Sequence, residues 1–191
     1  MALIREATAR ERARRVVTMT KTAASVLQEH VDAQERQASW DIFMSHAFDD
    51  KEIILGATKI IEDVGFTVYL DWRDDPLLDR KHVTAKTAMV LRERMRASKC
   101  LMYATTSNAA ESKWMPWELG FKDGQSNRSA ILPILTGSAT AFAGTEFLGI
   151  YPYVEDGLEQ GTTVNTLWVH RSSTCYVVLR GWLAGKEPTE H

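Results

Sequence analysis

Residues 40 to 45 read Trp40-Asp41-Ile42-Phe43-Met44-Ser45, a short apolar run that ends in polar residues. Asp49 and Glu52 follow with the spacing of a capping box, and apolar residues then recur at every third or fourth position until Gly65. A short apolar run followed by an amphipathic helix is the repeating unit of a parallel sheet. This stretch therefore predicts a buried strand and a helix that covers it.

The same unit recurs along the chain. Strands are predicted over residues 66–70, 99–103, 130–135 and 151–154, with helices over about 83–97, 112–122 and 175–182. Pro116 must lie in or near the first turn of its helix, which Gly124 closes, and Pro133 near a strand end or at an edge. Residues 136–149 predict a loop, and residues 155–172 show no assignable pattern. The alternation predicts an α/β fold with an open parallel sheet of about five strands.

Residues 2 to 38 contain neither glycine nor proline and are rich in Ala, Arg, Glu and Gln, which predicts one long helix. Its apolar seam is thin and cannot fold alone; it consists of Ala13, Val17, Thr20, Ala24, Leu27 and Val31. The helix must therefore pack on its own domain or contact another copy or partner. We divide the chain into an N-terminal helical extension over 1–38 and a main domain over 39–187.

Composition excludes several classes of protein. Hydrophobic residues make up 45% of the 191 residues, and 23 basic residues nearly balance 25 acidic ones, so no positive field favours nucleic acid as a partner. Two cysteines in apolar runs indicate a reducing cytoplasm, and the absence of long apolar stretches argues against a membrane span or export. The five histidines show no metal-ligand spacing, so we expect no metal.

Ligands of an open parallel sheet bind at the carboxyl ends of its strands. This rule selects residues 45–48 after the first strand, 71–75 after the second, 105–107 after the third, and the first turns of the following helix. In that helix Trp114 and Glu118 are four residues apart and share one face. Spacing alone leaves a second interpretation open, in which Trp114 is a core aromatic and Glu118 a solvated acid.

Three motifs together resemble the Toll/interleukin-1 receptor (TIR) domain over residues 39–135. They are residues 40–46, Arg73-Asp74-Asp75-Pro76, and Ser112-x-Trp114-x-x-x-Glu118-Leu119, and their order matches the first strand, the BB loop and the third helix of that family. Leu77-Leu78-Asp79 stands where the family often has a glycine after the proline. Only Gly181-Trp182 corresponds to the family's last Phe-Trp motif.

The resemblance implies a flavodoxin-like sheet and cleavage of the nicotinamide bond of NAD, with Glu118 at the position of the catalytic glutamate. One carboxylate suffices because nicotinamide is already a cationic leaving group and needs no general acid. Trp114 would wall the pocket and exclude water. Six further residues are candidates for binding the substrate: Phe48 and Trp72 by stacking, Ser45, His46 and Arg73 at phosphate or ribose, and Asp71 beside them.

The resemblance therefore predicts an NAD glycohydrolase or cyclase of the bacterial antiphage, Thoeris-like kind. NAD is then the substrate rather than a cofactor, and the product is ADP-ribose or a cyclic isomer that a separate effector protein senses. Self-association through the TIR surface and the N-terminal helix is expected. Two alternatives stay open: a non-catalytic signalling scaffold, and a nucleoside deoxyribosyltransferase-like enzyme. Whether water or an internal atom of the substrate captures the ribosyl centre is also open.

Overall fold

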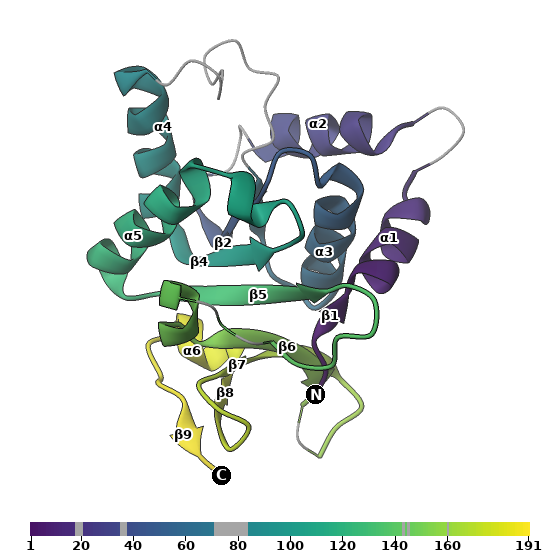
Figure 1. The fold of residues 1–191 in the computed structure, drawn as a ribbon, viewed down its shortest axis with the longest axis vertical. Coiled ribbons are helices and arrows are strands. Elements are labelled where there is room, and N and C mark those ends of the chain that lie inside the picture. The colour runs from purple at the N-terminus through teal and green to yellow at the C-terminus, as the bar shows by residue number, and fades with distance from the viewer. Residues whose placement is uncertain (18–20, 35–37, 71–83, 143, 145, 160) are drawn as a thin grey trace.

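The computed structural model describes residues 1–17, 21–34, 38–70, 84–142, 144, 146–159 and 161–191. Within these residues, nine strands form one sheet in the order β3-β2-β4-β5-β6-β7-β8-β9, and β1 also pairs with β5. Figure 1 shows helices on both faces of the first half of this sheet. The expected α/β fold with a mostly parallel central sheet is confirmed, and the sheet has more strands than the five expected.

The parallel half of the sheet consists of four strands and three helices. The strands are β2 (Trp40–Ser45), β3 (Val68–Leu70), β4 (Ser98–Thr105) and β5 (Ser129–Leu135); the helices are α3 (Lys51–Asp63), α4 (Ala85–Arg96) and α5 (Trp114–Ser126). Successive β2 side chains point to opposite faces, so Ile42 and Met44 join a core with α3 while Phe43 joins a second core with α4 and α5. Both faces of these strands are therefore buried.

The C-terminal part of the sheet is antiparallel, which the sequence patterns did not predict. β6 (Tyr153–Leu158) runs parallel to β5, and β7 (Asn165–His170), β8 (Cys175–Val178) and β9 (Thr189–Glu190) follow in antiparallel pairs. The prediction of a helix over 175–182 is wrong for its first half, because residues Cys175–Val178 form a strand that pairs with β7. Only α6 (Leu179–Leu183) is helical. Aromatic and β-branched residues favour that pairing.

The single helix expected over residues 2 to 38 is also wrong. The segment forms β1 (Ile4–Arg5), which pairs in parallel with the end of β5, and then two helices, α1 (Glu6–Arg14) and α2 (Ala23–Gln34). Within the seam, Ala13 and Leu27 are buried, whereas Thr20 and the side chain of Val31 lie outside the described part. The segment thus packs on its own domain; its role in self-association stays a prediction.

Helix α1 lies directly against α3, as Figure 1 shows. Gly56 of α3 makes this approach possible, since a Cβ atom at this position would lie 1.7 Å from the carbonyl oxygen of Ala9. Ile4, Ala9 and Ala13 are buried in the same core as α3. The N-terminal residues are therefore part of the main core.

Prolines and glycines account for several helix and strand ends. Pro116 is the third residue of α5, as expected, and Pro133 lies near the end of β5, where it pairs with Thr105. Helix α5 continues past Gly124 to Ser126, because Asn127 adopts the left-handed conformation (φ 51°) that ends the helix. In the described part of the chain, every helix is too short or too polar to cross a lipid bilayer.

Candidate active site

Ser45 and Glu118 form a buried hydrogen-bonded pair where β2 ends and α5 has completed its first turn. The Ser45 hydroxyl donates to Oε2 of Glu118 at 2.6 Å, and the Glu118 side chain has no exposed area. The interpretation of Glu118 as a solvated helix acid is therefore wrong. A glutamate buried to this extent is rare in proteins, and its position at the carboxyl end of the parallel strands marks a candidate site.

Local structure explains why Glu118 points inward. The Ser112 hydroxyl accepts the backbone N–H of Met115 at 3.3 Å, which starts α5 after a short 3-10 turn (Ala109–Glu111). Met115 and Leu119 anchor the same helix in the core shared with α4. Glu118 precedes Leu119 and follows Met115 by three residues, so it shares their buried face.

Tyr103, from β4, lies within electrostatic reach of Glu118. Burial raises the pKa of the Tyr103 phenol, and the negative charge of Glu118 raises this pKa further. The phenol therefore stays protonated at neutral pH. The site thus combines a carboxylate and two hydroxyl groups beneath the surface.

A cleft of about 320 Å³ lies beside the pair; we call it the Phe48 cleft. Its walls are Ala47, Phe48 and Asp49 from the loop after β2, and Asn108, Glu111, Ser112, Lys113 and Trp114 from the segment before and at the start of α5. Ala47 and Phe48 are two and three residues after Ser45 in the loop, and Trp114 precedes Glu118 by one helical turn. Residues close in sequence to Ser45 and to Glu118 therefore line the cleft, although Ser45 and Glu118 themselves do not.

Trp114 separates this cleft from a second one of about 280 Å³, lined by Ala88, Arg92, Lys113, Trp114 and Trp117. The Trp114 side chain is half-buried and meets Trp117 edge to face at 5.3 Å between ring centroids. Lys113 also lines both clefts. Aromatic and cationic side chains thus flank both sides of Trp114, an arrangement suited to a ligand with rings and phosphates.

The structure separates the other predicted binding residues into three groups. Phe48 lines the cleft with 40% of its surface exposed, as a stacking residue requires. His46 is buried, with Nδ1 2.9 Å from the Met44 carbonyl oxygen, and does not line the cleft. Asp71, Trp72 and Arg73 lie outside the described residues.

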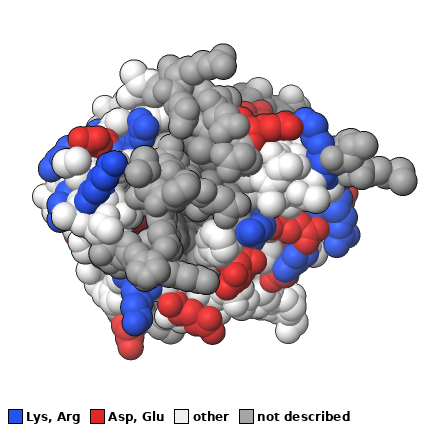
Figure 2. All heavy atoms as spheres, turned by 90° about the horizontal axis from the view of Figure 1, so that it is seen from above, with Lys and Arg blue, Asp and Glu red and all other residues white. Residues whose placement is uncertain are grey.

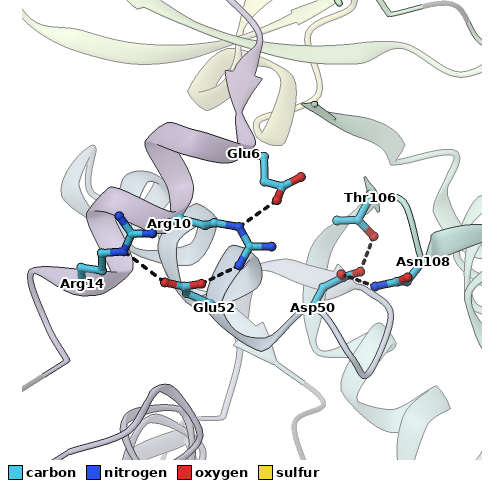
Figure 3. A network of polar contacts seen from close by, with 7 residues as sticks. All are labelled: Glu6, Arg10, Arg14, Asp50, Glu52, Thr106 and Asn108. Carbon is cyan, nitrogen blue, oxygen red and sulfur yellow. Dashed lines mark hydrogen bonds and ion pairs between the residues drawn. The ribbon is translucent and has the colours of Figure 1, made fainter. Parts of the chain in front are cut away.

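Sequence reasoning missed Asp50, which is buried beside the cleft. Its carboxylate accepts hydrogen bonds from the Thr106 hydroxyl and, at 2.7 Å, from the Asn108 amide (Figure 3). The expected capping box is wrong as well, because Asp50 occupies the cap position of α3 without capping it and Glu52 accepts from Arg10 instead. The acidic doublet Asp49-Asp50 in the loop after the first predicted strand was the available signal.

Charge is mixed on the face that Figure 2 shows, with acidic and basic side chains interspersed over the described surface. Within the described residues, no cluster of three or more His, Cys, Asp or Glu side chains could hold a metal ion. The described residues of the site therefore include hydroxyls, an amide, aromatic rings, two cations and four acidic side chains: Asp49, Asp50, Glu111 and Glu118.

Comparisons with known proteins place the chain in a family. No family model matches it. A protein of Bacillus cereus (strain MSX-D12), named "Probable 3′ cyclic ADP-D-ribose synthase ThsB′", is 42% identical over 164 residues, which are 85% of each chain. The "Putative cyclic ADP-D-ribose synthase TIR2" of Cytobacillus dafuensis is 32% identical over 83 residues, 43% of this chain and 22% of that protein. Given the identity and coverage of the first match, the chain belongs to the Thoeris-like TIR family that includes ThsB′.

Proposed function

We propose that the protein cleaves the bond between nicotinamide and ribose in NAD and closes the product into a cyclic ADP-D-ribose, a signal in antiphage defence. The observation that carries the proposal is the buried Glu118, held by Ser45 next to a cleft walled by Trp114. The similarity to ThsB′, which is named a 3′ cyclic ADP-D-ribose synthase, supports the same conclusion.

One carboxylate is enough for this cleavage. The bond between ribose C1 and the nicotinamide nitrogen breaks with its electron pair going to nicotinamide, which leaves as a neutral molecule and needs no proton. Positive charge develops on the ribose, and the carboxylate of Glu118 stabilises it electrostatically. Burial strengthens this interaction because few water dipoles compete with it.

Ser45 fixes the orientation of the Glu118 carboxylate through Oε2. A preorganised charge contributes more to the transition state than one that must reorient during the reaction. Because Glu118 has no exposed area, the groups that cover it must move when a substrate reaches it. Substrate binding and site opening are therefore coupled in this proposal.

The 3′ isomer is the product that the name of the Bacillus cereus relative favours. In that reaction the 3′ hydroxyl of the adenosine ribose attacks the ribosyl centre, so NAD⁺ yields cyclic ADP-ribose, nicotinamide and one proton. The dinucleotide must fold back on itself for this attack, in competition with water. Phe48 and Trp114 would favour folding by giving the substrate an apolar wall that excludes water.

Partners of the protein are part of the same proposal. We infer that a separate effector protein senses the cyclic product and that the chain self-associates when active. Ile4, Ala9, Ala13 and Leu27 of the N-terminal segment are already buried in the core of their own domain. Self-association would thus act on access to the site rather than on folding.

The test is incubation of the purified protein with NAD at several protein concentrations, followed by chromatography and mass spectrometry. We expect equal amounts of nicotinamide and of a product lighter than ADP-ribose by one water, which co-elutes with authentic 3′ cyclic ADP-ribose. ADP-ribose alone would identify a glycohydrolase. Absence of nicotinamide would contradict the proposal, and base exchange with deoxynucleosides in a parallel assay would favour the deoxyribosyltransferase alternative.

A further inference from the structure

Asp50 connects two segments that are more than fifty residues apart in the sequence. Its carboxylate binds Thr106 through one oxygen and Asn108, at 2.7 Å, through the other. Only 4% of Asp50 is exposed, so its hydrogen bonds to Thr106 and Asn108 replace the hydrogen bonds to water that the carboxylate loses on burial. Figure 3 shows all three side chains converging at the start of α3.

The segment that Asp50 holds forms one wall of the Phe48 cleft. Asn108 lines the cleft directly, and its carbonyl oxygen accepts the backbone N–H of Glu111, another lining residue. Ala109 is buried against the core that contains Ala47, a residue of the opposite wall. A shift of Asn108 would therefore move one wall of the cleft relative to the other.

The first turn of α3 is itself anchored. Arg10 of α1 donates to Glu6 at 2.7 Å and to Glu52 at 2.5 Å, and Arg14 lies 3.5 Å from Glu52 (Figure 3). Glu52 follows Asp50 by two residues. Asp50 thus lies at the start of α3, where the ion pairs between α1 and Glu52 hold the first turn in place. Through its hydrogen bond to Asn108, it also holds one wall of the cleft.

We propose that Asp50 is a positioning residue that acts through Asn108 and sets the ratio of cyclic to linear product. The inference rests on the proposed function. Cyclisation requires the two ends of the substrate to meet, whereas hydrolysis requires only a water molecule. A cleft wall that loses its anchor admits water and relaxes the folded substrate, so cyclisation suffers more than bond cleavage.

The test measures cyclic product, ADP-ribose, kcat and KM for Asp50→Ala, Asn108→Ala and the double variant. We expect each single variant to lower the ratio of cyclic to linear product about tenfold, because a misplacement of about 1 Å can cost about 10²-fold. Nicotinamide release should fall less. The double variant should show the same ratio as the single variants, since both interrupt one pathway.

Asp63→Ala is the matched control. Asp63 lies at the other end of α3, pairs with Arg12 and contributes nothing to the cleft. This control removes an acidic side chain from the same helix, so its product ratio should equal that of the parent. Asp50→Asn should restore part of the ratio, because its amide oxygen still accepts one hydrogen bond.

Several results would overturn the inference. Equal ratios of cyclic to linear product in Asp50→Ala and Asp63→Ala would overturn it. So would a double variant whose loss in this ratio equals the product of the losses in the two single variants. A parent that makes only ADP-ribose would overturn it as well, and a parent that releases no nicotinamide would overturn the proposed function together with it. If Asp50→Ala does not fold, Asp50→Asn and Asn108→Ala decide: ratios equal to that of the parent in both would refute the role.

Discussion

The parallel and antiparallel halves of the sheet differ in burial and in the use of their polar side chains. Helices cover both faces of β2 to β5, and nearly every residue of these strands is buried. In β6, β8 and β9 most residues are half-buried or exposed, whereas β7 is buried after its first residue. The candidate site lies entirely at the end of the parallel half.

The antiparallel half uses titratable rings for packing instead. His170 stacks between Tyr153, at 5.4 Å, and Tyr176, at 5.2 Å, and His191 stacks on Tyr176 at 4.3 Å. Tyr153, His170 and Tyr176 lie on neighbouring antiparallel strands, where facing side chains meet closely, and His191 directly follows β9. Substitutions in this half should therefore change the stability of the protein, whereas substitutions near Glu118 should change its catalytic activity.

The largest expected effect compares two tryptophans. Trp182 of α6 is 2% exposed and packs in the core with α3, so Trp182→Ala should lower the free energy of unfolding by about 3–5 kcal/mol. Trp114→Ala should cost about half as much, because Trp114 is half-buried, but it should reduce NAD turnover. Urea unfolding and turnover per folded molecule measure both. Equal losses of NAD turnover in Trp182→Ala and Trp114→Ala would contradict the expectation that only Trp114 affects catalysis.

Glu118→Gln tests the chemistry at nearly constant shape. The amide oxygen can still accept the Ser45 hydroxyl, so the fold should persist, while nicotinamide release should fall about 10²-fold or more with the loss of charge. Glu190→Gln in β9, an exposed position of the antiparallel half, is the matched control and should leave turnover unchanged. Turnover in Glu118→Gln within about threefold of the parent would remove Glu118 from the catalytic role, since one preorganised electrostatic group is worth far more.

Gly56→Ala should separate α1 from α3. The added methyl group would collide with the Ala9 backbone, and overpacking of this kind costs about 1–3 kcal/mol. Gly124→Ala on α5 has open space around it and should instead raise stability by up to about 1 kcal/mol. Thermal melting of both variants gives the comparison. A melting temperature of Gly56→Ala at or above that of the parent would show that the close contact is dispensable.

The smallest effect concerns pH. Burial lowers the pKa of His170 below its ordinary value, although Glu155 at 3.6 Å opposes this. The neutral ring therefore contributes stability that is present above a pH of about 6.5 and is lost as the pH falls below that value toward the folded-state pKa. Urea unfolding at pH 7.5 and pH 5 should show a steeper loss for the parent than for His170→Gln. Identical slopes would mean that His170 does not contribute.

Local patterns in the sequence predicted the parallel half well. The strand at residues 40–45 has the predicted bounds, and the pairing of Trp114 with Glu118 on one helix pointed to the site. These features depend on neighbours within a few residues, so short-range periodicity is enough to find them. Two of the three motifs that carry the family resemblance lie in these segments, and the third, residues 73–76, lies outside the described residues.

Other features depend on contacts between distant residues. Residues 175–178 have a spacing compatible with a helix, and only their pairing with β7 makes them a strand. Similarly, residues 2 to 38 are compatible with one helix, but Ile4 pairs with Ile134 as a strand, and α1 already ends at Arg14. Intrinsic propensities differ by about 1 kcal/mol or less per residue, so burial and strand pairing override them.

The amino-acid sequence was enough to predict the order of strands and helices in the parallel half. It also showed which residue types stand at the carboxyl ends of those strands. The burial of Glu118 with Ser45, 73 residues away, and the hydrogen bond between Asp50 and Asn108 are visible only in the folded structure. A charged side chain can be buried only where other groups replace its hydrogen bonds to water. Here those groups come from separate strands and helices, which meet only when the sheet has assembled.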